Sequence, residues 1–463
     1  MHSQGFDFKD EFMINFKEKA RTFFDSYLYP ICIAIVVFTC HTFSLEHLGV
    51  LLLFCSMLVG LILCTDIRVA IAPLFLITFT VSYKSFLAGN IGSVSFLVVA
   101  ILALIMLFVG VTFNIIHNKK AHFIKSAYKS KLFWGIVVLC GGFLLNGFFN
   151  FRDYKAINLT FALLLIFFFA IAFFVFYIGL DEREGNVEYL IFVLYVTSIL
   201  LIAEMIVLYI RDAIFINGEI IKESLILGWG VWNNVGGLLT MLIPIHFYYA
   251  STKKRGYVFY GTAILTYVTI LFTLSRSSLL FATIIFAICV IITCIKGVNT
   301  KINRIITVGL AVVAIIGIIA LWDKLSTTLS SYLNQGFNDN GRFELYKHGV
   351  DNFLSHPIFG GGFGSCLEDN FGHGIEPNRY HNTIIEMLAA CGIIGFGAYV
   401  FHRYQTVKLF IQAKKDESTI FLALTILALL LTSLLDNHLF NLYTTMYYSV
   451  ILCVIEKYQS TNK

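Results

Sequence analysis

Side chains that could bind an anion or move a proton lie in the C-terminal half of the sequence. Arg276 stands in the short segment Leu274–Ser278, between two apolar runs. A guanidinium group is suited to forked binding of phosphate. A second interpretation is equally open, in which Arg276 is a cation at a helix end whose charged head returns to water.

A second cation, Arg342, follows Asn340 and Gly341. Asn340 is suited to cap a helix, which predicts a helix from Gly341 to Leu354. The free backbone N–H groups of a helix start favour anions, so Arg276, Arg342 and this helix start could clamp a pyrophosphate. Taken singly, an arginine in the position of Arg342 is more often a solvated surface residue.

The segment His356–Gly364 is rich in glycine and includes Gly360 and Gly362. Such a segment permits either tight turns or a backbone nest that binds an anion. No strand precedes it and its spacing differs from the dinucleotide fingerprint. A plain turn is therefore the favoured interpretation of these glycines.

The sharpest candidate is His381, in the run Arg379-Tyr380-His381-Asn382 that leads into an apolar segment with Gly392 and Gly395. A neutral imidazole at the mouth of a helix can take a proton from an attacking hydroxyl group. The alternative is that His381 only makes hydrogen bonds at an interface. Without further context this second reading is the more common one.

Other polar residues give weaker signals. Glu204 lies inside an apolar run, where a carboxylate either has a function or pairs with a neighbouring helix. Trp232, Asn233 and Asn234 begin another such run and could bind a ligand or cap the helix. Asp436 and His438 stand in a late turn, where they could orient catalytic groups.

Long apolar runs must position these residues. The 463-residue chain is 58% hydrophobic and 13% charged, against about a quarter charged in a soluble domain. Its runs approach the roughly 20 residues that cross a bilayer as a helix. The predicted fold is an all-α integral membrane bundle of about 12–14 helices. Fourteen candidate spans start near residues 27, 47, 69, 93, 132, 158, 188, 232, 257, 277, 305, 383, 418 and 439. The third, Val69–Tyr83, is short and contains Pro73.

Clusters of lysine and arginine predict the orientation, because they accumulate in cytoplasmic loops. The clusters at residues 119–131, 253–255 and 403–415 agree with a cytoplasmic N-terminus. Arg276, the long segment from Asp323 to Asn382 and the Asp436 turn then face the other side. The boundaries expected are a cytoplasmic segment at 1–26, a helix bundle at 27–322, a large extracytoplasmic loop at 323–382 and C-terminal membrane helices at 383–456.

The long loop should contain ordered structure. Phe343, Tyr346, Val350 and either Phe353 or Leu354 recur near one helical stripe, and Pro357 follows. We expect this helix to lie over the outer membrane surface, since loops of such length are usually functional or disordered.

Several classes of chemistry lack their usual residues. The formal charge of +5 is a small excess spread over many loops, so no nucleic-acid partner is expected. Most of the cysteines lie in apolar runs, and no Cys-x-x-Cys pair, outer Asp-x-Asp pair or Walker-type loop is present. The sequence therefore predicts no metal site and no cofactor, and any donor molecule should arrive from the membrane.

The polar residues, taken in order, resemble those of the O-antigen ligase/polymerase family over residues 257–402. The resemblance is carried by Ser275-Arg276, Gly341-Arg342 with Tyr346, then Pro357, Gly360 and Gly362, then His381-Asn382 and Gly392-x-x-Gly395. It is one of ordered context rather than of a single motif. Tyr346 departs from the family pattern, which often has a tryptophan there.

This resemblance implies a metal-independent glycosyltransferase with a GT-C-like helical fold in the bacterial inner membrane. Its donor would be an undecaprenyl-pyrophosphate-linked glycan at the extracytoplasmic face. Arg276 and Arg342 would hold the pyrophosphate, and His381 would be the general base on the acceptor hydroxyl. The supporting candidates are Gly341, Gly360, Gly362, Arg379, Asn382, Asp436 and His438.

The sequence is compatible with three activities. A polymerase of surface polysaccharide, O-antigen or capsule, passes the chain to another lipid-linked repeat unit and is favoured. A ligase passes it to lipid A core or to protein, while a lipid-linked oligosaccharide flippase would not need the ordered loop. Membrane lipids are expected partners, and a chain-length regulator is left open. The cell-wall shape and division polymerases share the architecture, but the His381-Asn382 context favours the O-antigen group.

Overall fold

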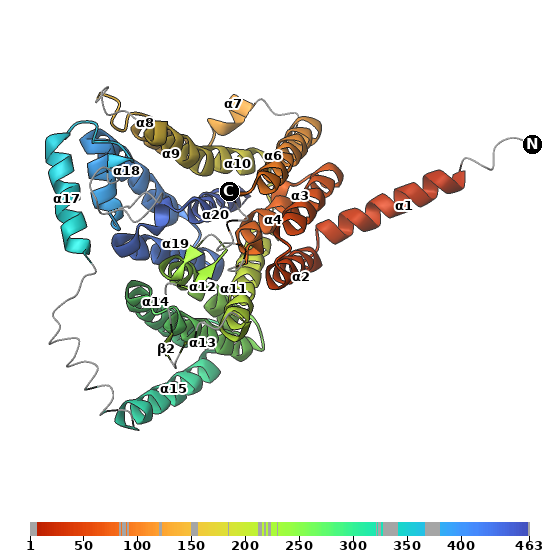
Figure 1. Cartoon of the computed structure of the whole chain (residues 1–463). Helices are drawn as coiled ribbons and strands as arrows, with labels where there is room; N and C mark the ends of the chain where they lie inside the picture. The colour runs from red at the N-terminus through yellow and green to blue at the C-terminus, as the bar shows by residue number, and fades with distance from the viewer. Residues whose placement is uncertain are drawn as a thin grey trace, which may run out of the picture.

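The computed structural model describes residues 7–82, 85, 89, 92–119, 123–149, 156–183, 185–211, 215–216, 219–220, 224–228, 230–320, 322, 326, 341–365 and 380–461. Within these residues the chain is helical, apart from two short antiparallel strand pairs (Figure 1). One pair joins β1 (Phe215–Ile216) to β2 (Glu219–Ile220), and the other joins β3 (Ile226–Leu227) to β4 (Gly230–Val231).

The helices of the N-terminal half follow in chain order. They are α1 (Asp7–Phe24), α2 (Leu28–Phe43), α3 (Glu46–Leu63), η1 (Ile67–Ala70), α4 (Ile71–Leu76), η2 (Ile77–Thr80), α6 (Val94–Asn114), η4 (Ile115–Lys119), α7 (Phe123–Ala127), α8 (Phe133–Leu144), α9 (Ala156–Ile166), η5 (Phe167–Ile171), α10 (Ala172–Gly179) and α11 (Gly185–Arg211). η4 and η5 are π-helical stretches that continue α6 and α9.

The helices of the C-terminal half carry most of the candidate residues. They are α12 (Trp232–Thr252), α13 (Gly256–Phe272), α14 (Arg276–Ile295), α15 (Thr300–Ala320), α17 (Arg342–Ser355), α18 (Thr383–Gln412), α19 (Glu417–Asp436), η8 (His438–Phe440) and α20 (Leu442–Thr461).

Several of these helices have the length of a membrane span. Eight helices in the described part of the chain are long and apolar enough to cross a membrane, and a ninth span results if α2 is joined to the end of α1. Each apolar run predicted from the sequence lies on a helix. The chain is an all-α integral membrane protein, as predicted. The finer count of 12–14 spans and the GT-C-like fold stay predictions.

The weakest predicted span is irregular in the structure. The described residues Ile67–Thr80 form three short consecutive helical pieces and belong to the apolar helices of only 10–17 residues. At a rise of about 1.5 Å per residue, such a helix falls short of the roughly 30 Å hydrocarbon core. A hydrophobic run read from sequence therefore does not guarantee a complete crossing.

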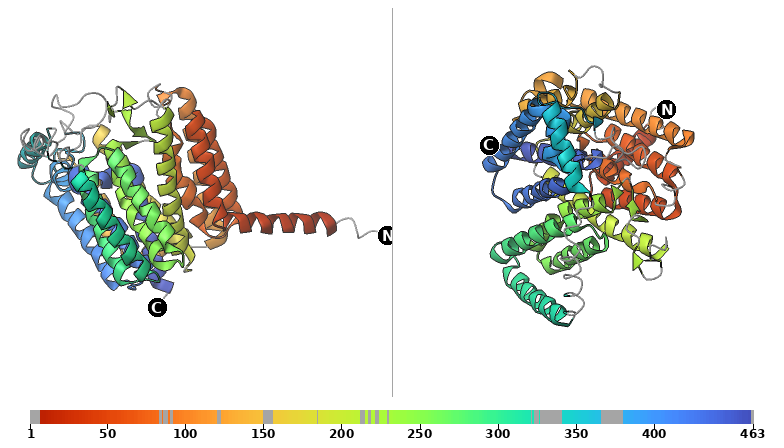
Figure 2. Two further views of the ribbon diagram at one scale, coloured as in Figure 1. Left: turned by 90° about the horizontal axis from the view of Figure 1, so that it is seen from below. Right: turned by 60° about the vertical axis from the view of Figure 1, so that its left-hand side comes forward.

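The long helices run side by side, and the two ends of the bundle differ. Figure 2 shows α17 and the short strands toward one end and the C-terminus at the other, with α1 projecting sideways from the bundle. The end of α1 is bent by 70° from α2. We call the end that carries the strands and α17 the α17 end.

Helix α12 lies at the centre of the C-terminal half. It packs against α11, α13, α14 and α19, and every residue from Val235 to Ser251 is buried. Because α12 has neighbours on all sides, its first turn at Trp232–Asn234 has a fixed position beside the last turn of α19. This packing sets the distance between polar residues that are far apart in the sequence.

Helix α18 is broken inside the bundle at Gly392, whose φ of 61° and ψ of −164° are not helical. The break frees backbone groups, and the segment from Pro357 supplies their partners. Gly361 and Gly362 donate to the carbonyls of Ala389 and Ala390 at 2.8 and 3.0 Å. In return Ile393 and Ile394 donate to the carbonyls of Pro357 and Ile358 at 2.9 and 3.2 Å. The predicted glycine turn thus supplies the backbone hydrogen bonds that the break removes from this membrane helix.

Glycine is required where the two backbones meet. Gly360 has a φ of +70°, and an added Cβ would come 2.3 Å from the carbonyl carbon of Ala390. At Gly392 an added Cβ would come 2.4 Å from the carbonyl carbon of Ile358. Any side chain at these positions would force the segment away from α18.

Candidate functional site

The carboxylate of Asp436, at the last residue of α19, is the centre of a polar cluster at the α17 end. Arg342 Nη2 donates to Asp436 Oδ1 at 2.7 Å, and His381 Nδ1 lies 3.3 Å from the same oxygen. The side chain of Asp436 is only 2% exposed, whereas those of Arg342 and His381 are 23% and 39% exposed. A buried anion therefore holds two groups that still reach solvent.

Two further donors complete the hydrogen bonds of this carboxylate. Asn233 Nδ2, in the first turn of α12, donates to Oδ1 at 3.1 Å. The hydroxyl of Ser277, in the first turn of α14, donates to Oδ2. Burying a carboxylate is costly unless it is paired and hydrogen-bonded. The four donors meet that cost and tie the starts of α12, α14 and α17 to the end of α19.

His381 is held in place by the residues on either side. Its φ of 51° lies in the left-handed region, which a residue other than glycine adopts only when its surroundings enforce it. On one side the N–H of buried Tyr380 donates to Glu386 Oε2 at 3.0 Å. On the other side Asn382 caps α18 by accepting from Ile384 N at 2.9 Å. The imidazole is therefore presented at a helix start by an enforced turn.

The start of α18 is also fastened to the end of α19. Asn382 Nδ2 donates to the carbonyl of Leu434 at 2.9 Å. Thr383 Oγ1 bonds to the carbonyl of Ser433 at 3.0 Å and to Asn437 Oδ1 at 2.8 Å. These contacts fix the separation between His381 and Asp436, because each lies next to a fastened residue.

Arg276 is the first residue of α14 and is exposed. It stands between Ser275, whose side chain caps the helix by accepting from Ser278 N, and Ser277, which donates to Asp436. Arg276 is therefore the sequence neighbour of a residue that bonds to Asp436. It also lies at a helix N-terminus, which itself favours anions.

Arg342 is the first residue of α17, and Gly341, with a φ of +79°, is its N-cap. The predicted cap at Asn340 and start at Gly341 are therefore one residue too early. The expected cap Asn340 and the candidate Arg379 lie outside the described residues. Arg342 is not a solvated surface cation, since it contacts Asp436 directly.

The backbone N–H groups around Gly360 and Gly362 are not free to bind an anion. Every backbone N–H from Gly360 to Ser365 donates within the protein, including Phe363 to Asn146 Oδ1 at 3.2 Å and Gly364 to Asn158 Oδ1 at 2.6 Å. This leaves the turn rather than the nest as the role of Gly360 and Gly362. They support the site from a distance by fixing α18.

His438 and Glu204 are buried away from solvent. His438 is 1% exposed and its ring lies against Gly237 of α12, where an added Cβ would come 2.4 Å from Nε2. Glu204 of α11 lies 3.8 Å from His41 Nδ1 of α2, and both side chains are 0% exposed. The sequence left two interpretations of Glu204 open. The structure supports the second, in which this residue pairs with a neighbouring helix.

Sequence reasoning missed the anchors of Asp436. Ser277 was not singled out, although it stands beside Arg276, and Asn233 was considered only as a ligand contact or a cap. No local signal links either residue to Asp436, because the contacts span 159 and 203 positions of the chain. Only the packing of α12 and α14 on α19 brings them together.

The arrangement can provide a base and a cation on two different side chains that share one carboxylate. When imidazole Nδ1 donates to a carboxylate, Nε2 carries the lone pair and can accept a proton. The same carboxylate steadies the guanidinium of Arg342, which remains a fixed positive charge. A proton acceptor and cations suited to phosphate therefore stand side by side at one end of a membrane bundle.

Comparison with known families finds one match in the C-terminal half of the chain. A family model described as O-Antigen ligase matches residues 261–400, a range that contains Arg276, Arg342 and His381 but ends before Asp436. No curated protein matches the chain. The match supports a membrane enzyme of the O-antigen ligase/polymerase type. The resemblance read from the sequence is confirmed, in that residues 261–400 of this multi-pass membrane protein match the O-antigen ligase family model.

Proposed function

We propose that the protein is a glycosyltransferase of surface-polysaccharide synthesis that uses an undecaprenyl-pyrophosphate-linked glycan as donor. Polymerisation of repeat units is the favoured activity, with the reaction at the extracytoplasmic face of the bacterial inner membrane. The observation that carries the proposal is the contact of both Arg342 and His381 with the buried carboxylate of Asp436.

The chemistry follows from the roles of these groups. His381 Nε2 accepts the proton of the acceptor hydroxyl as its oxygen attacks the anomeric carbon of the donor sugar. The bond from that carbon to the pyrophosphate oxygen breaks, and the electron pair leaves with the lipid pyrophosphate. Arg342 and Arg276 neutralise the negative charge that develops on this leaving group. Asp436 is a positioning residue, since it orients both the base and one cation.

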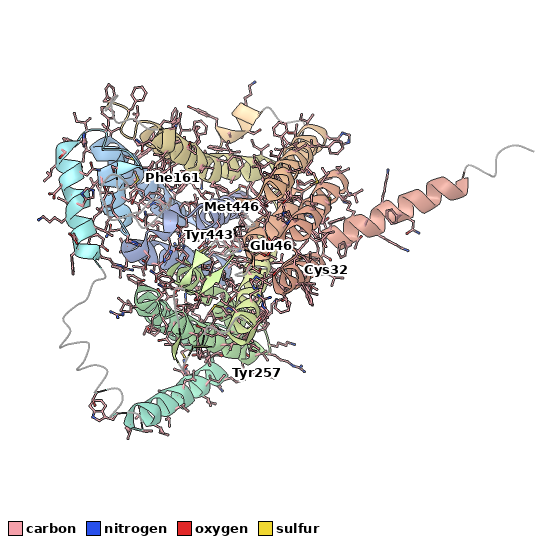
Figure 3. The ribbon with its side chains drawn as sticks, in the orientation of Figure 1. Cys32, Glu46, Phe161, Tyr257, Tyr443 and Met446 are labelled. Atoms are coloured by element: carbon pink, nitrogen blue, oxygen red, sulfur yellow. The ribbon has the colours of Figure 1, made fainter. Side chains whose placement is uncertain are left out.

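An apolar cavity supports a donor that arrives from the membrane. Its volume is 1210 Å³, and its lining includes Phe54, Leu107, Phe108, Phe168 and Met446. Figure 3 labels Met446 and Tyr443, another lining residue, near the middle of the molecule. Side chains of this kind suit a hydrocarbon chain.

Polar residues of the cavity lie near the Asp436 cluster. Asn441 Nδ2 donates to Asn234 Oδ1 at 2.9 Å, and both side chains line the cavity. Asn234 follows Asn233, which bonds to Asp436. A lipid chain in the cavity could therefore place its pyrophosphate toward Arg276 and Arg342.

The test is a gel profile of surface and lipid-linked glycans in a deletion strain complemented with wild type, His381→Ala or Lys347→Ala. Lys347 is exposed on α17 and is the matched control. Wild type and Lys347→Ala should restore a full ladder, whereas His381→Ala should leave single repeat units. Long lipid-linked chains that accumulate untransferred would identify a ligase. A full ladder with His381→Ala would contradict the catalytic base and favour a flippase or a structural role.

A further inference from the structure

Helix α17 presents three different faces. The first packs on α18, where an added Cβ at Gly349 would come 2.5 Å from Ile385 Cγ2. On the same side Asn352 Nδ2 donates to the carbonyl of Ala389 at 3.2 Å and to Tyr380 Oη at 3.3 Å. This face is closed by protein and fixes the rotation of the helix about its axis.

The second face is apolar and exposed. Phe343, Val350 and Leu354 are 68%, 47% and 67% exposed, and their separations of seven and four residues put them on one stripe. We call these three residues the α17 stripe. The third face carries the exposed charges of Glu344, Lys347 and Asp351. At 100° per residue, these charges lie between the stripe and the α18 contact. One face is therefore suited to lipid and another to water.

The position of α17 fits a membrane boundary. Figures 1 and 2 show the helix at the edge of the molecule, across the end of the bundle and beside α18. α18 is long and apolar enough to cross the membrane, and it exposes Ile384 (40%) in its first turn and Ile393 (52%) further along. The exposed apolar surface thus continues from a membrane-crossing helix to a helix across its end. Ile358, 56% exposed, lies three residues after the end of α17.

We propose that the α17 stripe is seated in the lipid leaflet at the α17 end, with its side chains at the boundary between headgroups and acyl chains. Amphipathic helices bind membranes at this depth through one apolar face and keep their charges toward water. Because Arg342 begins the same helix, lipid contact would hold its guanidinium near the level of lipid phosphates. This last consequence rests on the proposed function, whereas the contact itself does not.

The test places tryptophan on two faces of α17 in the full-length protein. Leu354→Trp and Val350→Trp probe the stripe, and Asp351→Trp is the matched control on the charged face. Each variant is reconstituted into phosphatidylethanolamine/phosphatidylglycerol nanodiscs, and the emission of the wild-type protein with its four tryptophans is subtracted. Lipids brominated on the upper acyl chain quench from the leaflet, and iodide quenches from water.

The two stripe variants should be quenched at least twofold more strongly by brominated lipid than Asp351→Trp, and less strongly by iodide. Equal iodide quenching of all three variants would show the stripe in water and overturn the proposal. Protection of the stripe variants from both quenchers would show that protein covers it, either a second copy or a partner, and would also overturn it. Two stripe positions guard against one variant that fails to fold. Quenching is measured without glycan transfer. The lipid contact of the α17 stripe can therefore be disproved while the proposed function stands, and the proposed function can be disproved while the lipid contact stands.

Discussion

Two of the buried acidic side chains, Asp436 and Glu204, lie in very different surroundings. Asp436 accepts from Arg342, Asn233 and Ser277, and His381 and Arg342 extend from it to solvent. Glu204 faces His41 at 3.8 Å with both side chains sealed, and neither of its oxygens has a hydrogen-bond partner among the described residues. A buried charge in a membrane protein is a functional hypothesis by default. The difference teaches that access to solvent, and not burial of an acidic group, distinguishes the candidate site.

Removal of the charge of Asp436 should have the largest effect. Asp436→Asn keeps the shape but leaves Arg342 and His381 without their anion, so glycan transfer should fall about 100-fold or more. Transfer is measured in membranes with lipid-linked donor, at matched protein levels. Glu204→Gln makes the same carboxylate-to-amide change in the sealed pair and is the control. If both variants lose transfer equally, access does not separate the two sites.

A methyl group at Gly360 should destabilise the fold that carries the site. Gly360→Ala combines a φ of +70° with a contact of 2.3 Å to the backbone of Ala390, so the free energy of unfolding should fall by about 3 kcal/mol. Thermal unfolding of the purified protein in detergent checks this. Gly397→Ala in the same helix meets nothing within 4 Å and should not be destabilised. A stable Gly360→Ala protein would show that the backbone hydrogen bonds between the glycine segment and α18 are dispensable.

Loss of one donor to Asp436 should have a moderate effect. Ser277→Ala removes the hydroxyl that donates to Oδ2, and one hydrogen bond to a charged group contributes about 1.5–3 kcal/mol. Transfer should fall about tenfold if most of that energy orients the carboxylate. Thr293→Ala, near the other end of α14, removes a hydroxyl whose hydrogen bonds within the described residues go to the carbonyls of Cys289 and Val290 in the same helix, and it should retain full transfer. No loss with Ser277→Ala would mean that Oδ1 alone orients the site.

A change in the buried pair of Glu204 and His41 should have the smallest effect. Glu204→Gln replaces a buried carboxyl group whose oxygens have no hydrogen-bond partner among the described residues. Transfer should therefore change less than threefold, and the free energy of unfolding by about 1 kcal/mol or less. Transfer assays and thermal unfolding of the same preparation check both values. A large loss of transfer with an unchanged unfolding temperature would assign the pair a role in the reaction.

The sequence predicted the helices and the candidate residues better than it predicted their partners. Apolar runs identify α11 or α14 because each run is local, and Arg342 was expected at the start of a helix. The bond from Arg342 to Asp436 spans 94 positions and depends on how α17 and α19 pack, which no local pattern records. Periodicity likewise put Phe343 and Val350 on one stripe, but it could not say that Gly349 makes the contact with α18.

The break in α18 has a consequence for how the protein is made. Its freed carbonyls at Ala389 and Ala390 accept from Gly361 and Gly362, and that of Ala389 also accepts from Asn352. All three donors precede α18 in the chain, and an unsatisfied backbone group in hydrocarbon costs several kcal/mol. During synthesis this helix therefore cannot settle in the bilayer as an independent unit. It must wait until the glycine segment that precedes it has folded back against it. The loop is in this sense an internal assembly factor for its own membrane helix, and a chain that fails this docking step would expose the break to quality-control proteases before it could act on any substrate.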